Sequence, residues 1–198
     1  MTSSPAPRLV LASASPRRAH ILGTLGIPFR VVVSAVDESL LPDETGEAAV
    51  ERLARRKAAV VAERLSSADG PLPVLGADTE VLCAGRILGK PESEAGALEM
   101  LALLAGRAHE VVTGVCVAHR GVLHSGLERS IVTLAPMTEA ERRWYVATGE
   151  PMDKAGGYHV DGRGALFIES VAGSPSNVAG LPVRLVRRLF LEAGLEVL

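Results

Sequence analysis

The sequence predicts an α/β protein with a mixed, twisted sheet flanked by helices. Short apolar segments typical of strands alternate irregularly with longer amphipathic segments typical of helices. Two short turn signals, Ala84-Gly85 and Arg120-Gly121, join neighbouring strand segments directly as hairpins. Hairpins pair their strands antiparallel, so the pattern indicates a mixed sheet rather than a regular parallel one.

The expected strands are short apolar segments bounded by Gly, Pro or polar residues. In chain order these segments are Arg8–Ala12, Phe29–Val36, Val74–Ala77, the hairpin Thr79–Leu88, His109–His119, Val122–Leu134 and Leu166–Val171. The segments Ser66–Pro73 and Glu150–Gly157 are expected to be loops.

Caps and stop signals mark the expected helices. Ser15 before Pro16 predicts a helix start, because serine caps helices and proline is tolerated in their first turn. Ser93 is a second expected cap, and Thr138 with Glu141 has the spacing of a capping box. The expected helices are Pro16–Leu25, Glu47–Leu65, Ser93–Leu104, Thr138–Thr148 and Val183–Ala193.

Length and composition indicate one domain over residues 1–198, either compact or built of two tightly joined lobes. The net charge of −2 argues against a general nucleic-acid binder. No apolar run is long enough for a membrane span or a signal peptide, so we expect a cytoplasmic protein that contacts neither membrane nor nucleic acid. Cys83 and Cys116 are expected to be reduced and buried, and no ligand cluster suggests zinc.

The stretch "LASASPRR" places two cations at a predicted helix start. The helix dipole disfavours Arg17 and Arg18 there by roughly 0.3–1 kcal/mol each, and a bound anion would reverse that effect. Free backbone N–H groups, the hydroxyls of Ser13 and Ser15, and two guanidinium groups would together bind phosphate well. The alternative is a capped helix with solvated arginines.

A lysine falls on the apolar face of the long predicted helix. Lys57 lies seven residues after Val50, four after Leu53 and four before Val61, which places it on the inward side. Either this lysine extends along the edge of the apolar stripe into solvent, or its ammonium points into a functional cleft.

Acidic residues follow two apolar segments. Asp78 comes after a glycine in "VLGADTE", where a carboxylate could serve as a base or metal ligand or could cap the next turn. Asp37 and Glu38 follow Phe29–Val36 in the same way, and two such carboxylates could share a divalent cation. Lys90 stands in a turn, "LGKP", where it could reach a phosphate or be an ordinary surface lysine.

Together these groups suit the hydrolysis of a polyphosphate. The cations would hold phosphate groups, a metal would offset charge, and a carboxylate would position water.

The same stretches resemble the Maf family of nucleoside triphosphate pyrophosphatases over roughly residues 9–189. The matching segments, in order, are "LASASPRR", "VDE", "LARRKA", "VLGADTEV", "GKP", "GRAHEVVTGV", "GEPMDKAGGY" and "SNVAGLP". The resemblance implies a two-lobed fold of the Maf/ITPase-like type with a substrate cleft between the lobes. It also implies hydrolysis of a nucleoside triphosphate between its α and β phosphorus atoms, with Mg²⁺ or Mn²⁺ required, and we expect a homodimer.

The resemblance implies roles for particular residues. The expected phosphate-binding residues are Ser13, Ser15, Arg17 and Arg18. The expected catalytic residues are Asp78 as general base, Glu38, Lys57 and Lys90, with Glu38 and Asp78 also as metal ligands. The residues expected near the base are Thr79, Tyr158 and Asp161.

One stretch departs from the family pattern. The branch resembling dTTP and UTP hydrolases has Gln where "GYHVDG" has Asp161, and an ionised Asp only accepts hydrogen bonds. The segment "DKAG" still resembles that branch more than the one acting on 7-methyl-GTP, so dTTP and UTP are the expected substrates. A house-cleaning role against non-canonical nucleotides is expected; the alternatives are 7-methyl-GTP as substrate, a nucleotide-binding regulator of septum formation and a metal-dependent phosphomonoesterase.

Overall fold

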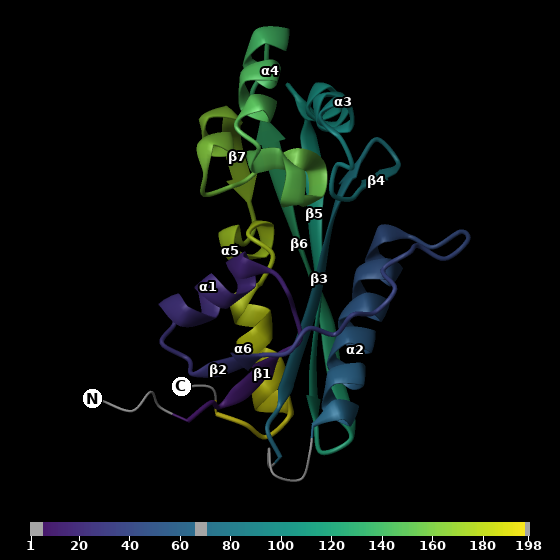
Figure 1. Ribbon diagram of the computed structural model, residues 1–198, viewed down its shortest axis with the longest axis vertical. Coiled ribbons are helices and arrows are strands. Elements are labelled where there is room, and N and C mark those ends of the chain that lie inside the picture. Colours follow the sequence, from purple (N-terminus) through teal and green to yellow (C-terminus); the bar gives the residue numbers. More distant parts are fainter. Residues whose placement is uncertain (1–5, 66–70, 197–198) are drawn as a thin grey trace. The chain divides into compact units, whose positions relative to one another are not determined.

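A computed structural model describes residues 6–65 and 71–196. Its strands form one seven-stranded sheet in the order β2-β1-β3-β5-β6-β7, with β4 paired to β3 (Figure 1). The strands are β1 (Leu9–Leu11), β2 (Phe29–Val31), β3 (Val74–Cys83), β4 (Arg86–Leu88), β5 (Ala108–His119), β6 (Val122–Leu134) and β7 (Ile168–Ala172). β1 runs parallel to β2 and β3, whereas β3–β4 and β6–β7 are antiparallel. The predicted mixed α/β sheet is confirmed.

The predicted helices are all found, each within one residue of its expected bounds. The helices are α1 (Pro16–Thr24), α2 (Gly46–Arg64), α3 (Glu94–Leu104), α4 (Glu139–Ala147), α5 (Pro175–Val178) and α6 (Val183–Glu192). The Ser93 hydroxyl accepts from the Gly96 N–H, and Thr138 with Glu141 forms the predicted capping box. Ser15 holds the N-cap position, but its side chain makes no capping hydrogen bond.

Four predicted strand or loop boundaries are wrong. The segment Val74–Ala77 and the first arm of the hairpin are one strand, β3, so Asp78 lies inside a strand and not at its end. The strand expected to reach Val36 stops at Val31, and the expected loop Glu150–Gly157 is two short 3₁₀ helices, η2 (Glu150–Asp153) and η3 (Ala155–Gly157). A third 3₁₀ helix, η4 (Arg163–Phe167), takes the first residues of the last predicted strand.

The chain divides into two compact units. Unit 1 comprises Met1–Asp78, Thr113–Glu128 and Gly180–Leu198, and unit 2 comprises Thr79–Val112 and Arg129–Ala179. β3, β5 and β6 therefore contribute residues to both units.

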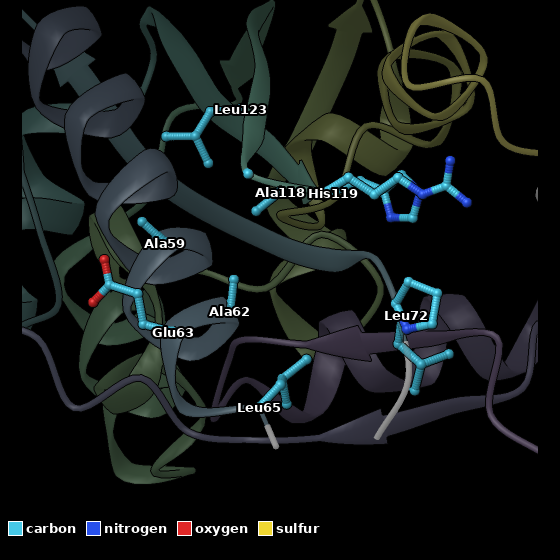
Figure 2. A pocket seen from close by; sticks show the side chains of 11 residues that line it. Ala59, Ala62, Glu63, Leu65, Leu72, Ala118, His119 and Leu123 are labelled. Atoms are coloured by element: carbon cyan, nitrogen blue, oxygen red, sulfur yellow. The ribbon is translucent and has the colours of Figure 1, made fainter. Parts of the chain in front are cut away.

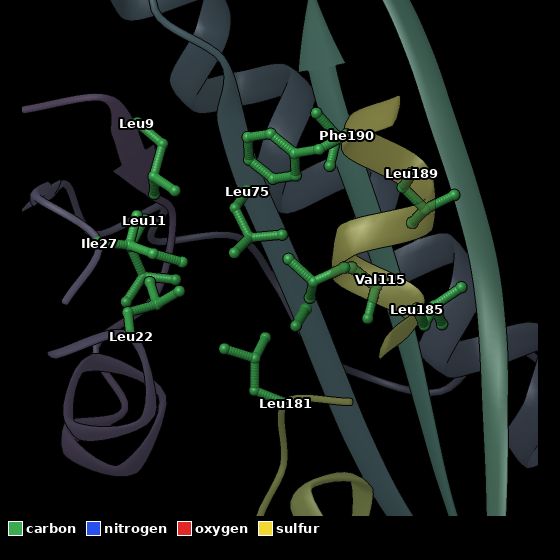
Figure 3. Packing of buried hydrophobic residues seen from close by; sticks show 13 residues of the cluster. Leu9, Leu11, Leu22, Ile27, Leu75, Val115, Leu181, Leu185, Leu189 and Phe190 are labelled. Atoms are coloured by element: carbon green, nitrogen blue, oxygen red, sulfur yellow. The ribbon is translucent and has the colours of Figure 1, made fainter. Parts of the chain in front are cut away.

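The core of unit 1 lies on both faces of its strands, because successive strand residues point to opposite faces. Leu9 and Leu11 of β1 pack with residues of α1 and α6 in one cluster, part of which Figure 3 shows around Leu75 and Val115. Val10 belongs to a second cluster, with α2. The sheet of unit 1 is thus covered by helices on both faces.

Two glycines let α2 lie directly on the strands of unit 1. A Cβ atom added to Gly76 would stand 2.4 Å from the Ala54 carbonyl oxygen, and one added to Gly114 would stand 2.3 Å from the Val50 carbonyl oxygen. No side chain fits in either place, so the backbone of α2 touches the sheet at two points. This close approach sets how near Lys57 of α2 comes to β3.

Unit 2 has its own apolar core between its strands and helices α3 and α4. Val81 of β3, Leu101 of α3 and Tyr145 of α4 are each at most 2% exposed within it. Tyr145 is the largest of the fully buried side chains. Its phenol is polar, so its buried hydroxyl needs hydrogen-bond partners.

Cys83 and Cys116 are free and buried, as predicted. Burial raises the pKa of the Cys116 thiol to about 11, which makes it a poor nucleophile at neutral pH. Within residues 6–65 and 71–196, none of the helices is both long and apolar enough to span a bilayer.

Candidate active site

The ammonium group of Lys57 lies between two carboxylates of unit 1. Its Nζ is 2.6 Å from Oδ1 of Asp78 and 2.6 Å from Oε1 of Glu38. Lys57 is 5% exposed and the side chain of Asp78 10%, whereas that of Glu38 is 55% exposed. The alternative in which Lys57 extends into solvent is therefore wrong, and its inward position follows from the face of α2 on which it lies.

This arrangement joins groups from three separate parts of the chain. Glu38 comes from the segment after β2, Lys57 from α2 and Asp78 from β3. One ammonium faces two carboxylates, so the three side chains carry a formal charge of −1. A buried ion pair is costly to desolvate, and such pairs are poor devices for stability alone. The trio is therefore a better candidate for chemistry than for folding.

Arg18 is buried at the start of α1 and holds that turn together. Its Nε donates to the Gly180 carbonyl oxygen at 2.8 Å, and one Nη donates to the Ser13 hydroxyl at 3.2 Å. The Ser13 hydroxyl also accepts from the Ser15 N–H at 3.1 Å. The alternative of solvated arginines is therefore wrong for Arg18, while Arg17 is half-buried.

The charges of Asp78 and Glu38 act on Arg18 at the start of α1. Burial lowers the pKa of Arg18, the charge of Asp78 acts to raise it, Arg17 lowers it further, and Glu38 raises it. The charge of Asp78 has the largest of these charge effects on Arg18, so the guanidinium and the buried carboxylate interact electrostatically. The structure thus brings the predicted residues of unit 1 into a single cluster.

The other predicted residues belong to unit 2. Thr79 follows Asp78 directly in β3 and is half-buried, while Lys90 and Asp161 are exposed. Tyr158 is buried, and its hydroxyl lies 2.8 Å from Nε2 of His109. Burial lowers the pKa of His109 to about 4, so its ring is neutral at neutral pH.

Sequence reasoning missed several buried polar groups of unit 2. Lys154 is 7% exposed and pairs with Asp153. The Tyr145 hydroxyl donates to the Glu150 carboxylate at 2.7 Å. The one sequence signal was the stretch "GEPMDKAGGY", which contains three of these residues. No spacing rule marked them.

The carboxylates of Glu38 and Asp78 could together bind a cation. In the part of the chain that the structure describes, no group of three or more His, Cys, Asp and Glu side chains could hold a metal ion. Magnesium in nucleotide enzymes is commonly held by one or two carboxylates together with substrate phosphates. Glu38 and Asp78 fit that donor set.

A pocket in unit 1 has a different lining. This cavity of about 470 Å³ is lined by Ala59, Ala62 and Glu63 of α2 and, among others, by His119 and Leu123 (Figure 2). None of the predicted site residues lines it. The pocket is therefore distinct from the cluster around Lys57.

The chain is similar to known proteins over nearly its whole length. The model of the family described as Maf-like protein matches residues 8–193. The dTTP/UTP pyrophosphatase of Moorella thermoacetica is 48% identical over 195 residues, covering 96% of this chain and 97% of the relative. The dTTP/UTP pyrophosphatase of Anaeromyxobacter sp. (strain Fw109-5) is 47% identical over 192 residues, covering 94% and 90%.

A further relative and a solved structure are also similar to this chain. The dTTP/UTP pyrophosphatase of Pectobacterium atrosepticum is 44% identical over 183 residues, covering 92% of this chain and 91% of the relative. The Staphylococcus aureus Ham1 protein structure aligns over 94% of this chain and 98% of that one at 15% identity, with a TM-score of 0.42. The family match and the sequence identities agree over nearly the whole chain: this protein belongs to the Maf-like protein family.

Proposed function

We propose that this protein is a nucleoside triphosphate pyrophosphatase that hydrolyses the α–β phosphoanhydride of dTTP and UTP. The products are the monophosphate and pyrophosphate, and the cellular role is the removal of surplus or non-canonical nucleotides. The observation that carries the proposal is the buried ammonium of Lys57 between Asp78 and Glu38, in a chain 48% identical to a protein named for this activity.

The start of α1 binds the phosphate groups. Ser13 and Arg17 contact phosphate oxygens, together with the backbone N–H groups and hydroxyl of the Ser15 turn. Arg18 contributes its charge and keeps Ser13 in place, because two of its donors already bond to Ser13 and Gly180. The anion then offsets the unfavourable position of two cations at a positive helix end.

Asp78 positions and deprotonates the attacking water. Its Oδ1 accepts the Lys57 hydrogen bond, so we assign the water to Oδ2. A carboxylate fixed by a buried ammonium has one orientation, which holds the water in line with the α-phosphorus. The bond from this phosphorus to the bridging oxygen breaks, and pyrophosphate leaves with the electron pair.

Charge on the leaving group is offset from several sides. Lys57 and Lys90 are assigned to the phosphate oxygens, where positive charge is worth most in the transition state. A Mg²⁺ or Mn²⁺ ion bound by Glu38 and Asp78 would neutralise further charge on the triphosphate. Glu38, which is 55% exposed, is the more accessible of the two ligands.

The base is assigned to the residues of unit 2. Thr79 adjoins the catalytic carboxylate in β3, Tyr158 is held by His109, and Asp161 is exposed on the segment after it. Pyrimidine nucleotides are the proposed substrates because the curated relatives carry dTTP and UTP in their names. Those names also favour hydrolysis over the regulatory alternative.

A product assay tests the proposal. Purified protein is incubated with Mg²⁺ or Mn²⁺ and a panel of nucleoside triphosphates, and monophosphate, pyrophosphate and phosphate are quantified separately. We expect monophosphate and pyrophosphate in equal amounts, fastest from dTTP and UTP, and a loss of at least about 100-fold in Asp78→Asn. Release of inorganic phosphate as the first product would indicate a phosphomonoesterase instead. Turnover by Asp78→Asn equal to that of the unchanged protein would show that Asp78 is not the general base.

A further inference from the structure

Two side chains, the buried Tyr145 and the half-buried Glu150, support the segment that carries Asp161. The Tyr145 hydroxyl donates to Oε1 of Glu150 at 2.7 Å and accepts from the His159 N–H at 3.0 Å. The Glu150 carboxylate accepts two further backbone N–H groups, from Arg163 at 3.0 Å and from Gly164 at 2.9 Å. Two side chains thus bind the backbone of the segment 159–164 at both of its ends.

The fit between this segment and the pair is close. A Cβ atom added to Gly164 would stand 2.6 Å from the Tyr145 hydroxyl oxygen, and one added to Gly162 would stand 2.5 Å from a Glu150 carboxylate oxygen. At Gly164 only glycine leaves room, because the added Cβ atom would also stand 2.7 Å from the His159 carbonyl oxygen. The backbone therefore lies directly on the two polar groups rather than over a layer of side chains.

The negative charge of Glu150 strengthens its hydrogen bonds to the backbone N–H groups of Arg163 and Gly164. Burial acts to raise the pKa of Glu150, but the N–H groups of Arg163 and Gly164 and the Tyr145 hydroxyl lower it, and the net direction is downward. The carboxylate is therefore ionised at neutral pH and accepts hydrogen bonds only. Hydrogen bonds to a charged acceptor are stronger than those to a neutral one.

The residue before this segment is anchored separately. Tyr158 is 5% exposed and its hydroxyl meets the buried ring of His109. Asp161 is exposed and lies in sequence between the anchored N–H groups of His159 and Arg163. A short segment fixed at both ends gives the backbone of Asp161 few conformations, which lowers the entropy cost of a selective contact with a ligand.

We propose that Tyr145 and Glu150 are positioning residues: they fix the segment 159–164 and thereby orient Asp161 toward the base of the bound nucleotide. This inference rests on the proposed function, because it takes a nucleotide as the ligand. It extends that function by assigning base discrimination to two side chains that are not among the predicted phosphate-binding or metal-binding residues.

Backbone hydrogen exchange measures the first half of the proposal without any nucleotide. In Tyr145→Phe the ring keeps its place in the core, but the His159 N–H and Glu150 each lose a partner. We expect the amides of the segment 159–164 to exchange at least about 10-fold faster in Tyr145→Phe and in Glu150→Gln. Glu139→Gln is the matched control, since Glu139 is an exposed residue of α4 that pairs with Arg143 on the same helix. Unchanged exchange in both variants would overturn the proposal.

Base discrimination measures the second half. The ratio of dissociation constants for the α,β-methylene analogues of dTTP and dGTP is determined for the unchanged protein, Tyr145→Phe, Asp161→Ala and the double variant. We expect Tyr145→Phe to reduce the ratio about 10-fold when Asp161 is present and to change it less than about 2-fold in the Asp161→Ala background. A purely structural role would give the same loss in both backgrounds, and that result would overturn the proposal.

The two arms separate the possible failures. If the unchanged protein releases no pyrophosphate but discriminates between the analogues as predicted, the proposed function alone is contradicted. Analogues that bind without base preference contradict the inference alone. A melting temperature within a few degrees of the unchanged protein confirms that each variant is folded, and Glu150→Gln provides the second variant if Tyr145→Phe is not.

Discussion

Nζ of Lys57 lies 2.6 Å from Oδ1 of Asp78, and both residues are at most 7% exposed. The pair exists because α2 touches β3 at Gly76, two residues before Asp78. Ala54 and Ala58 of α2 flank that point, and Lys57 stands between them in sequence. Gly76 lets α2 approach β3, and the Lys57–Asp78 ion pair then holds a carboxylate in the interior of unit 1.

Lys57→Met should cost both stability and activity. Removing the ammonium leaves Asp78 buried without its counter-charge, which costs about 3–5 kcal/mol of the free energy of unfolding. The double variant Lys57→Met/Asp78→Asn should recover a large part of that loss, because neither position of the pair then carries a charge. Urea denaturation measures both. Arg56→Met, at an exposed neighbour on α2, is the control and should change stability by less than about 0.5 kcal/mol. A double variant no more stable than Lys57→Met would contradict the ion-pair account.

Gly76→Ala should separate the strand from the helix. The added Cβ would stand 2.4 Å from the Ala54 carbonyl oxygen and 2.8 Å from the Ala58 backbone nitrogen, and neither backbone atom can move alone. We expect a loss of about 3 kcal/mol in the free energy of unfolding. Gly23→Ala is the matched control, since nothing lies within 4 Å of its Cβ position in α1, and it should be neutral or stabilising. Equal effects of the two substitutions on the urea midpoint would disprove the close-approach argument.

Local signals predicted the frame of the fold well. The Ala84-Gly85 and Arg120-Gly121 turns have positive φ at all four residues, the conformation that two-residue hairpins favour. The capping box of α4 formed as its spacing predicted. These features depend on residues a few positions apart, so the sequence pattern contains them.

Long-range features were predicted less well. Asp78 was expected at a strand end, yet β3 continues through it because a counter-charge 21 residues away in the chain lets the carboxylate be buried. The Tyr145–His159 and Glu150–Gly164 hydrogen bonds each join positions 14 residues apart. No periodicity or short motif encodes such pairs, and only the fold shows them. Lys57 was the exception, because helical periodicity alone placed it on the inward face.

Arg17 and Arg18 should differ although they are neighbours. Arg18 is 9% exposed and donates to Gly180 and Ser13, so Arg18→Ala removes two charge-assisted hydrogen bonds and should lower the free energy of unfolding by about 2–4 kcal/mol as well as activity. Arg17→Ala should raise KM for the nucleotide at least about 10-fold and change stability by less than about 1 kcal/mol.

Steady-state kinetics and urea denaturation of both variants check this division of roles. Arg18→Lys is a further test, because a lysine keeps the charge but lacks the planar group that reaches two acceptors at once. It should recover little of the lost stability. A stability loss in Arg17→Ala as large as that in Arg18→Ala would show that both arginines brace the turn.

The buried histidine of unit 2 predicts a pH dependence of stability. Burial lowers the pKa of His109 to about 4 in the folded protein, against 6.5 for the free side chain. Between these two values the unfolded chain binds a proton that the folded chain does not, so the free energy of unfolding rises with pH in that window. Stability is therefore complete above about pH 6.5 and declines as the pH falls toward about 4. The difference between the two pKa values corresponds to about 3 kcal/mol.

Urea denaturation between pH 4 and 7.5 measures this slope. His109→Gln removes the titrating ring but keeps a polar group beside the Tyr158 hydroxyl, and it should flatten most of the decline between pH 6.5 and 4. A smaller slope should remain, because burial also lowers the pKa of His119. His20→Gln, at an exposed position of α1, is the control and should retain the full slope. A slope that persists unchanged in His109→Gln would mean that other groups carry the pH dependence and that the His109–Tyr158 contact is not its source.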